Sequence, residues 1–165
     1  MTPDLQVRSH PAIDKISPPE AEALLTQARA LQRAAQAGAT QPLLRGKNLG
    51  LLCAAPDGAD ALLFRRAATE LGARVSHVLP SLSETSTAQE VAHTARMLGR
   101  LYDALECQGM PPALVGRIGQ AAGVPVYDGI ATPEHPTARL ADQLEGGTVE
   151  NRRFVVQASL LSTMG

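Results

Sequence analysis

The chain alternates short strand-like segments with longer amphipathic ones, and this alternation restricts the fold more than any other feature. The strand-like segments are NLGLLCAA (48–55), RVSHVL (74–79), DALECQ (103–108) and VPVYDG (124–129). The first is continuously apolar, as expected of a strand that is covered on both faces. Strands that alternate with helices are joined by right-handed crossovers in a parallel sheet. The sequence therefore predicts an α/β fold in three layers, with a parallel sheet of four or more strands and helices on both faces.

Capping residues mark where the intervening helices begin. A capping box at Ser17 and Glu20, with proline in the first turn, predicts a helix over about 18–37. A second box at Thr87 and Glu90 opens another helix. The predicted inner face of that helix consists of Val91, Ala95, Leu98 and Leu101. These boundaries place one helix before the first strand and one between the second and third strands.

The segment CAAPDGADALLFRRAATELGARV (53–75) is typical of a strand end, a tight turn and a helix that closes at Gly72. A helix that begins at the carboxyl edge of a parallel sheet is suited to bind an anion, because its free N–H groups and its dipole favour negative charge. This turn instead carries Asp57 and Asp60. We expect Asp57 to accept hydrogen bonds from the N–H groups near Asp60 and so to stabilise the start of the helix.

Length and charge exclude several classes of protein. The 165 residues predict one domain over 1–165, with an N-terminal extension at 1–16. With 15 Lys and Arg against 16 Asp and Glu, and no basic run, nucleic acid is not an expected partner. No segment approaches the roughly 18 apolar residues that span a bilayer, and the first residues do not resemble a signal peptide. We expect a cytoplasmic protein without a membrane partner.

The candidate metal and redox residues are few. Cys53 and Cys107 lie in strand-like segments, where a free thiol packs as a small apolar group. His77 and His93 have no companion at a catalytic or metal-binding spacing. The sequence therefore predicts no disulfide, no metal site and no cofactor.

The last two segments are predicted to be helical. HPTARLADQLEGG (135–147) is typical of a short helix that ends at glycine, and 148–165 of a terminal helix. The terminal helix is apolar around much of its circumference. We expect it to dock against the rest of the chain or against another chain.

Three segments resemble the carbamoyl-phosphate domain of the aspartate and ornithine carbamoyltransferases. They are LRGKNLGLL, HTARMLGRLYDAL and AGVPVYDGIATPEHPTARLADQL, and the resemblance covers about 18–145 in the same order and spacing. The segment VENRRFVVQASLLSTMG is similar to the family's carboxy-terminal helix, and only EGGTV separates it from the Leu-Ala-Asp helix. The resemblance thus implies a carbamoyltransferase that lacks its amino-acid-binding domain but retains the terminal helix.

The resemblance also implies where the family's chemistry would lie. Family members use neither a metal nor a covalent intermediate. They hold carbamoyl phosphate with a Ser-Thr-Arg-Thr turn, an arginine that ends the third strand, and the His and Gln of His-Pro-x-Gln. The corresponding positions here are Asp57, Gly58, Ala59 and Asp60 for the turn, Gln108 for the arginine, and His135 and Ala138 for the last motif. Of these residues only His135 matches, so the sequence predicts no catalytic residue of the family type.

The substitutions oppose the binding of a phosphate. Like charges within about 4 Å repel by about 1 kcal/mol in water and by several at lower dielectric. Each lost charge-assisted hydrogen bond forgoes about 1.5 to 3 kcal/mol. Since a 1 mM ligand is bound by only about 4 kcal/mol, we expect no useful affinity for carbamoyl phosphate.

Three functions remain open on this sequence. The first is a non-catalytic module for assembly or regulation. Because family members form trimers, the resemblance implies that this module is a homotrimer or a hetero-oligomer with a full-length relative. The second is an enzyme that supplies His135 to a composite site with a partner subunit, or that acts on an uncharged or cationic substrate near Asp57 and Asp60. The third is a sensor that binds a small molecule in the old cleft. His135 itself is either a surviving substrate contact or only the start of a helix.

Overall fold

A computed structural model of the chain describes residues 16–164, and a parallel sheet lies at its centre. Its strands are β1 (Asn48–Leu52), β2 (Arg74–Val78), β3 (Ala104–Cys107) and β4 (Val126–Asp128). They lie in the order β2-β1-β3-β4, and Leu49 of β1 pairs with Val75 on one side and with Ala104 on the other. The predicted parallel α/β sheet is confirmed.

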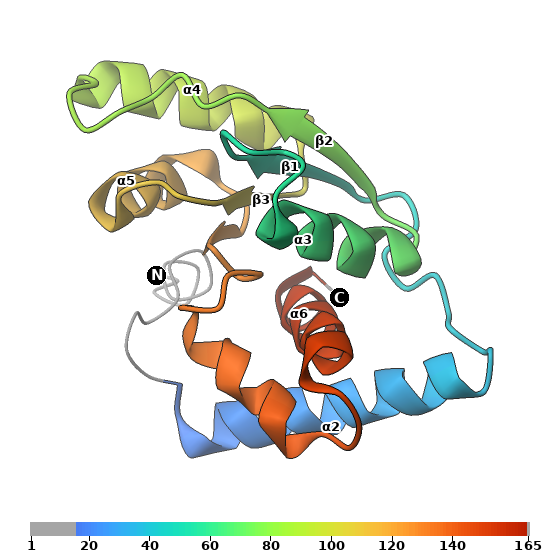
Figure 1. Ribbon diagram of the computed structural model, residues 1–165. Coiled ribbons are helices and arrows are strands. Elements are labelled where there is room, and N and C mark those ends of the chain that lie inside the picture. Colours follow the sequence, from blue (N-terminus) through green and yellow to red (C-terminus); the bar gives the residue numbers. More distant parts are fainter. Residues whose placement is uncertain (1–15, 165) are drawn as a thin grey trace.

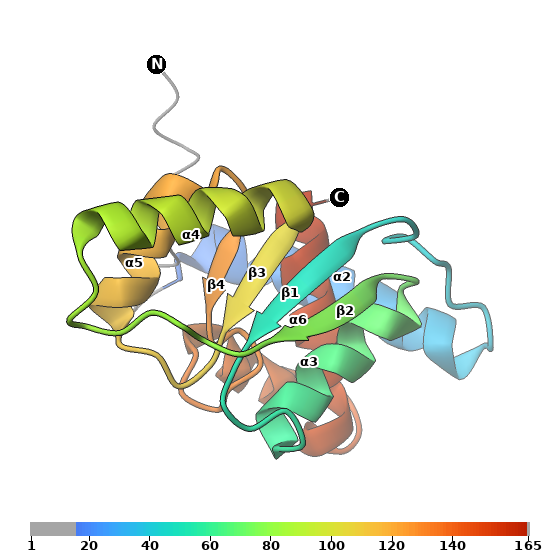
Figure 2. The ribbon, with the colours of Figure 1, turned by 90° about the horizontal axis from the view of Figure 1, so that it is seen from above.

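Helices cover both faces of the sheet, as Figures 1 and 2 show. They are α2 (Pro18–Gln36), α3 (Ala59–Glu70), α4 (Ala88–Leu101), α5 (Pro112–Ala122), the 3-10 helix η1 (Pro136–Gln143) and α6 (Thr148–Met164). Helices α4 and α5 pack on one face, whereas α3 and α6 lie on the other. Helix α2 forms a further outer layer on the side of α6 that faces away from the sheet, at the bottom of Figure 1.

The continuous apolar segment of β1 is buried from both sides. Leu49 and Leu51 belong to the core beneath α3 and α6, and Leu52 belongs to the core beneath α4 and α5. Cys53 and Cys107 are both buried and free, as expected. The apolar character of residues 49–52 is therefore explained by the helices on the two faces of the strand.

The two capping boxes are present. The amide of Glu20 donates to Ser17 Oγ over 3.2 Å, and the amide of Glu90 donates to Thr87 Oγ1 over 3.1 Å. Helix α2 ends at Gln36, one residue before the predicted end. These caps confirm the helix starts that the sequence predicts.

The predicted inner face of α4 is wrong at one residue. Val91, Ala95 and Leu98 are buried, but Leu101 is 59% exposed. Leu101 is the last residue of α4, and ten helical steps of about 100° place it about 80° from Val91 around the axis. Tyr102, which follows the helix, packs against this core instead.

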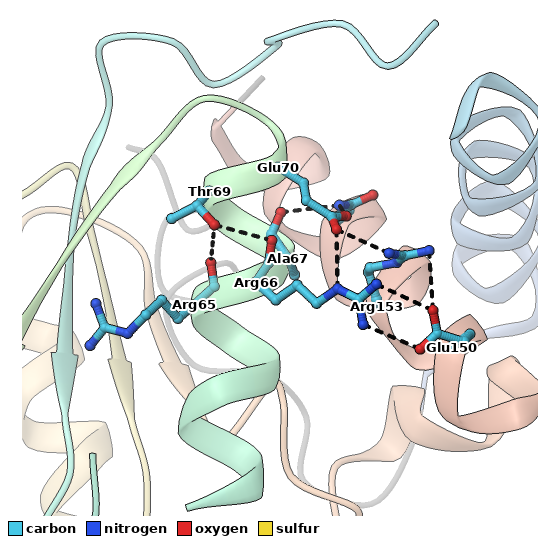
Figure 3. A network of polar contacts seen from close by, with 8 residues as sticks. Arg65, Arg66, Ala67, Thr69, Glu70, Glu150 and Arg153 are labelled. Atoms are coloured by element: carbon cyan, nitrogen blue, oxygen red, sulfur yellow. Dashed lines mark hydrogen bonds and ion pairs between the residues drawn. The ribbon is translucent and has the colours of Figure 1, made fainter. Parts of the chain in front are cut away.

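Helix α6 lies between α3 and α2 and is buried around most of its circumference, which confirms the prediction that it docks. Polar contacts fix it to α3 (Figure 3). Glu70 accepts from Arg66 over 3.1 Å and from Arg153 over 3.0 Å, and Glu150 accepts from Arg66 over 3.2 Å. The buried Gln157 amide donates to Ala67 O and to Glu70 Oε1, each over 3.1 Å.

Two predictions about the ends and the surroundings of the chain have different outcomes. The predicted extension at 1–16 lies outside the described residues except for its last residue. Within residues 16–164, no helix combines the length and the apolar character needed to cross a membrane.

Candidate functional site

The carboxyl ends of β1, β3 and β4 meet at one edge of the sheet because the strands are parallel. The residues that the sequence singles out follow these strand ends. They come from the turn before α3, from the residue after β3, and from the segment between β4 and η1. This edge is the candidate site.

The turn before α3 does not have the cap that the sequence predicts. The N-cap residue is Gly58, with extended backbone angles of φ −70° and ψ 161°, and no side chain caps the helix. Asp57 therefore lies one residue outside the helix and is exposed. The expectation that Asp57 accepts from the first helical N–H groups is wrong, because Asp57 precedes the N-cap position, from which a side-chain oxygen reaches those groups.

Gln108 connects the end of β3 to the start of α3. Its side-chain Nε2 donates to the backbone oxygen of Asp60 over 3.1 Å and to Glu106 Oε2 over 3.1 Å. Its backbone N–H donates to Leu52 O, which continues the ladder between β1 and β3. The amide of Gln108 thus has both of its donor hydrogens engaged within the chain.

Glu106 is a fully buried carboxyl group on β3. Its Oε1 accepts from the amide of Ile130 over 2.9 Å, and its Oε2 accepts from the amide of Ala131 over 3.1 Å. Burial raises the pKa of Glu106 to about 8, against the effect of these donors, and the nearby charge of Asp128 raises it further. The group therefore ties the loop after β4 to the centre of the sheet.

His135 begins η1 as its N-cap residue. The amide of Thr137 donates to His135 Nδ1 over 3.2 Å, which places the ring proton on Nε2. Burial lowers the pKa of His135 to about 4, so the ring is neutral at physiological pH. Among the described residues, Nε2 is buried without a hydrogen-bond partner. Ala138 is half-buried, and its backbone N–H donates to His135 O over 2.9 Å.

Arg152 of α6 also reaches this edge. Its Nη2 donates to Ala131 O over 2.8 Å, next to the amide that binds Glu106. Its Nε is buried without a partner in the described part of the chain. A guanidinium group thus lies beside the same loop that Glu106 holds.

The contacts connect some of the sequence-predicted residues and leave others apart. Asp60 and Gln108 touch, and Glu106 continues the connection to the loop that leads to His135. Asp57, Gly58 and Ala59 belong to the turn but add no side-chain hydrogen bond to it. Across residues 16–164, no group of His, Cys, Asp or Glu side chains is arranged to hold a metal ion.

Sequence reasoning missed Glu106 and Arg152. A signal for Glu106 is present, since it is the one charged residue of a strand, ALEC, that is otherwise apolar. Arg152 has a weaker signal. It is one of two adjacent arginines, Arg152 and Arg153, in an otherwise apolar terminal helix, and such a pair is also typical of a helix edge that faces solvent. What places both residues at the site is tertiary contact.

Comparison with protein families gives one match over most of the chain. The family model described as aspartate/ornithine carbamoyltransferase, carbamoyl-P binding domain, matches residues 8–145. The chain belongs to the aspartate/ornithine carbamoyltransferase family. The match ends before α6, so the similarity of α6 to the family's terminal helix stays a prediction.

The relatives within this family are ornithine and aspartate carbamoyltransferases. The ornithine carbamoyltransferase of Actinobacillus pleuropneumoniae serotype 5b is 38% identical over 125 residues, which are 76% of this chain and 37% of that protein. The ornithine carbamoyltransferase of Pyrococcus furiosus has a structure with a TM-score of 0.65 at 26% identity, over 76% of this chain and 40% of that one.

The aspartate transcarbamoylase of Trypanosoma cruzi has the same fold, with a TM-score of 0.65 at 24% identity over 85% of this chain and 45% of that one. The chain spans little more than a third of the curated carbamoyltransferases that it matches.

Proposed function

We propose that this family member does not bind carbamoyl phosphate in the family's manner and acts without catalysis, as an assembly or regulatory module. The bonding of Gln108 carries the proposal. This residue stands where the resemblance places a phosphate-binding arginine, and its amide hydrogens are directed to Glu106 and to Asp60 O. The position is neutral, and its donors are used inside the chain.

The electrostatics of the turn support the same conclusion. Where the resemblance implies three hydroxyl groups and an arginine, the turn carries the carboxyl groups of Asp57 and Asp60. Bound phosphate would meet like charge there, without the guanidinium group that forms bidentate hydrogen bonds to phosphate. The combined loss exceeds the roughly 4 kcal/mol that corresponds to millimolar binding.

Calorimetric titration tests the proposal. We expect the wild-type chain to give no heat of binding with carbamoyl phosphate, and no turnover with ornithine or aspartate. A rebuilt variant carries Asp57→Ser, Gly58→Thr, Ala59→Arg, Asp60→Thr, Gln108→Arg and Ala138→Gln. It should gain measurable affinity, and Asp57→Ala with Asp60→Ala should not, because it removes charge without adding donors. Micromolar affinity or turnover by the wild-type chain alone would overturn the proposal.

Assembly is the function that a non-catalytic module of this family can still perform. The resemblance implies a homotrimer, or a hetero-oligomer with a full-length carbamoyltransferase, in a cytoplasmic location. Sedimentation velocity of the chain, alone and mixed with such a relative, measures both forms of association.

A second function is favoured by one specific observation. The neutral His135 retains a buried Nε2–H that has no partner in residues 16–164, and Arg152 lies beside the neighbouring loop. Two donors of this kind suit a composite site that a partner subunit completes. In that case carbamoyltransferase activity would appear only in the mixture with the partner and would be lost in the His135→Asn variant, which keeps a capping oxygen.

A further inference from the structure

A groove of about 470 Å³ lies between α2 and the carboxy-terminal end of α6. Its lining includes Ala23, Leu24 and Gln27 of α2, Leu43 of the loop after α2, and Leu161 and Ser162 of α6. Leu24 is half-buried and Leu43 at the rim is 53% exposed, so apolar carbon is open to solvent there. A hollow of this size with mainly apolar walls is suited to cover aliphatic side chains.

The chain that precedes α2 starts close to this groove. Ile16, the first described residue, packs against the same core cluster as Leu24 and Leu161. Eight helical residues rise about 12 Å, so Leu24 lies only that far along α2 from Ile16. Residues 1–15, the N-terminal segment, lie outside the described residues, and a chain of that length spans at most about 50 Å. The segment is therefore long enough to follow the whole groove.

The sequence of the N-terminal segment suits an apolar groove. Leu5, Val7 and Ile13 are its large aliphatic residues. The family match begins at residue 8, so residues 8–15 belong to the matched domain and are not a linker to another unit. Burial of aliphatic side chains is the main favourable contribution to folding, and part of a domain is expected to bury its own against that domain.

We propose that the N-terminal segment docks in this groove of its own chain, running back along α2 with Ile13 beside Leu24 and Val7 farther along, toward Leu43. A short tether holds such a segment at an effective concentration of about millimolar, so it occupies the groove ahead of a free chain of equal affinity. Docked there, the segment joins α2 to the last turns of α6. The proposal goes beyond the proposed function, which names no such surface.

Truncation tests whether the N-terminal segment covers the groove. A chain that begins at Asp14 keeps Ile16 and the capping box of Ser17 and Glu20, so α2 retains its start. We expect this chain to bind the apolar dye ANS about twofold or more above the full chain, because the leucines of the groove lose their cover. Unchanged dye binding would overturn the proposal.

A peptide of residues 1–13 with an amidated end separates loss of cover from a general loosening of the fold. Added to the truncated chain, it should bind and reverse the gain in dye signal. In that chain Gln27→Trp should weaken peptide binding about tenfold or more, because the indole ring fills the groove. Gln36→Trp is the matched control, since the exposed Gln36 lies about 180° around α2 from Gln27. Equal peptide affinities of the two variants would place the peptide elsewhere and overturn the proposal.

Cross-linking of the full chain identifies the occupant. Val7→Cys with Ser162→Cys should join within one chain on treatment with a short bifunctional maleimide; the native cysteines are buried and do not compete. Val7→Cys with Glu84→Cys should join far less, because Glu84 is an exposed residue before α4, which packs on the opposite face of the sheet. Equal yields from the two pairs would overturn the proposal. So would a product of twice the chain mass, which would place the segment of a second copy in the groove.

Discussion

Glu106 combines complete burial with three N–H donors. The donors from Ile130, Ala131 and Gln108 favour the carboxylate, while the loss of water favours the neutral acid. Burial has the larger effect, and the pKa rises to about 8. The folded chain therefore holds this proton over a pH range in which the unfolded chain has released it.

A pH series on Glu106→Gln tests this balance. The folded pKa of Glu106 is raised above its unfolded value of 4.5, so its ionisation lowers the stability of the wild type as pH rises from about 4.5 to about 8. The variant lacks this dependence. We expect the free energy of unfolding of the wild type, relative to the variant, to fall by up to about 1.4 kcal/mol per pH unit. Urea denaturation at several pH values measures it, and a difference that stays constant with pH would contradict the assignment. His135 titrates in both proteins and cancels.

The residues of the site could be predicted only where local sequence decides them. The motif around His135 was found by resemblance, and its N-cap role follows from the next two residues. The cap at Gly58 was missed because Asp57 is the stronger capping residue by type, although the turn places it one position too early. Glu106 and Arg152 act on a loop more than 20 residues away in each case. No local pattern encodes such a contact.

At the scale of elements, α4 and α5 approach so closely that only glycine fits at one position. A Cβ atom on Gly99 of α4 would lie 1.9 Å from Ala122 O of α5. Contact at that distance requires the two helices to move apart, and the core they share with the sheet would loosen.

Gly99→Ala should therefore destabilise the chain by about 3 kcal/mol, despite the higher helix propensity of alanine. Gly147→Ala is the control, since a Cβ there meets nothing within 4 Å, and it should change stability by less than about 0.5 kcal/mol. Chemical denaturation of the two variants gives the comparison. Equal stabilities would show that the helices can separate at little cost.

A second joint between elements is made by buried amides. Asn151 of α6 donates to Leu144 O over 3.2 Å and to Glu145 O over 3.1 Å, and it accepts from Gln32 of α2 over 2.9 Å. It is only 2% exposed. One side chain thus joins α2, α6 and the end of the η1 segment.

Asn151→Ala should cost about 3 kcal/mol, because it leaves the buried groups of three segments unpaired. Arg66→Ala in α3 removes the ion pairs of Arg66 to Glu70 of α3 and to Glu150 of α6, but the Arg66 side chain is 51% exposed. Solvent screens such pairs, so that loss should stay within about 1 kcal/mol. Thermal unfolding of both variants shows which of the two sets of contacts stabilises the fold more. A larger loss of stability in Arg66→Ala than in Asn151→Ala would contradict our account of how α6 is held.

At the scale of the whole molecule, the order of strands and helices could be predicted because each element carries its own signal. The continuous apolar character of β1, the two capping boxes and the glycines after α3 and α5 are all local. The position of α2 outside α6 could not be predicted in this way. An amphipathic helix reveals that it has a partner, but its period does not identify which one.

That outer position of α2 has a consequence for synthesis on the ribosome. Helix α2 is the first described element to be translated, and its buried face packs mainly against α6, which is completed more than a hundred residues later. At bacterial or eukaryotic rates of elongation that interval lasts about 6 to 25 seconds. During this interval Leu25, Ala28 and Leu31 face water or a chaperone, while the strands of the sheet can already pair with one another. Of the helices in residues 16–164, the first to be made is thus among the last to be packed.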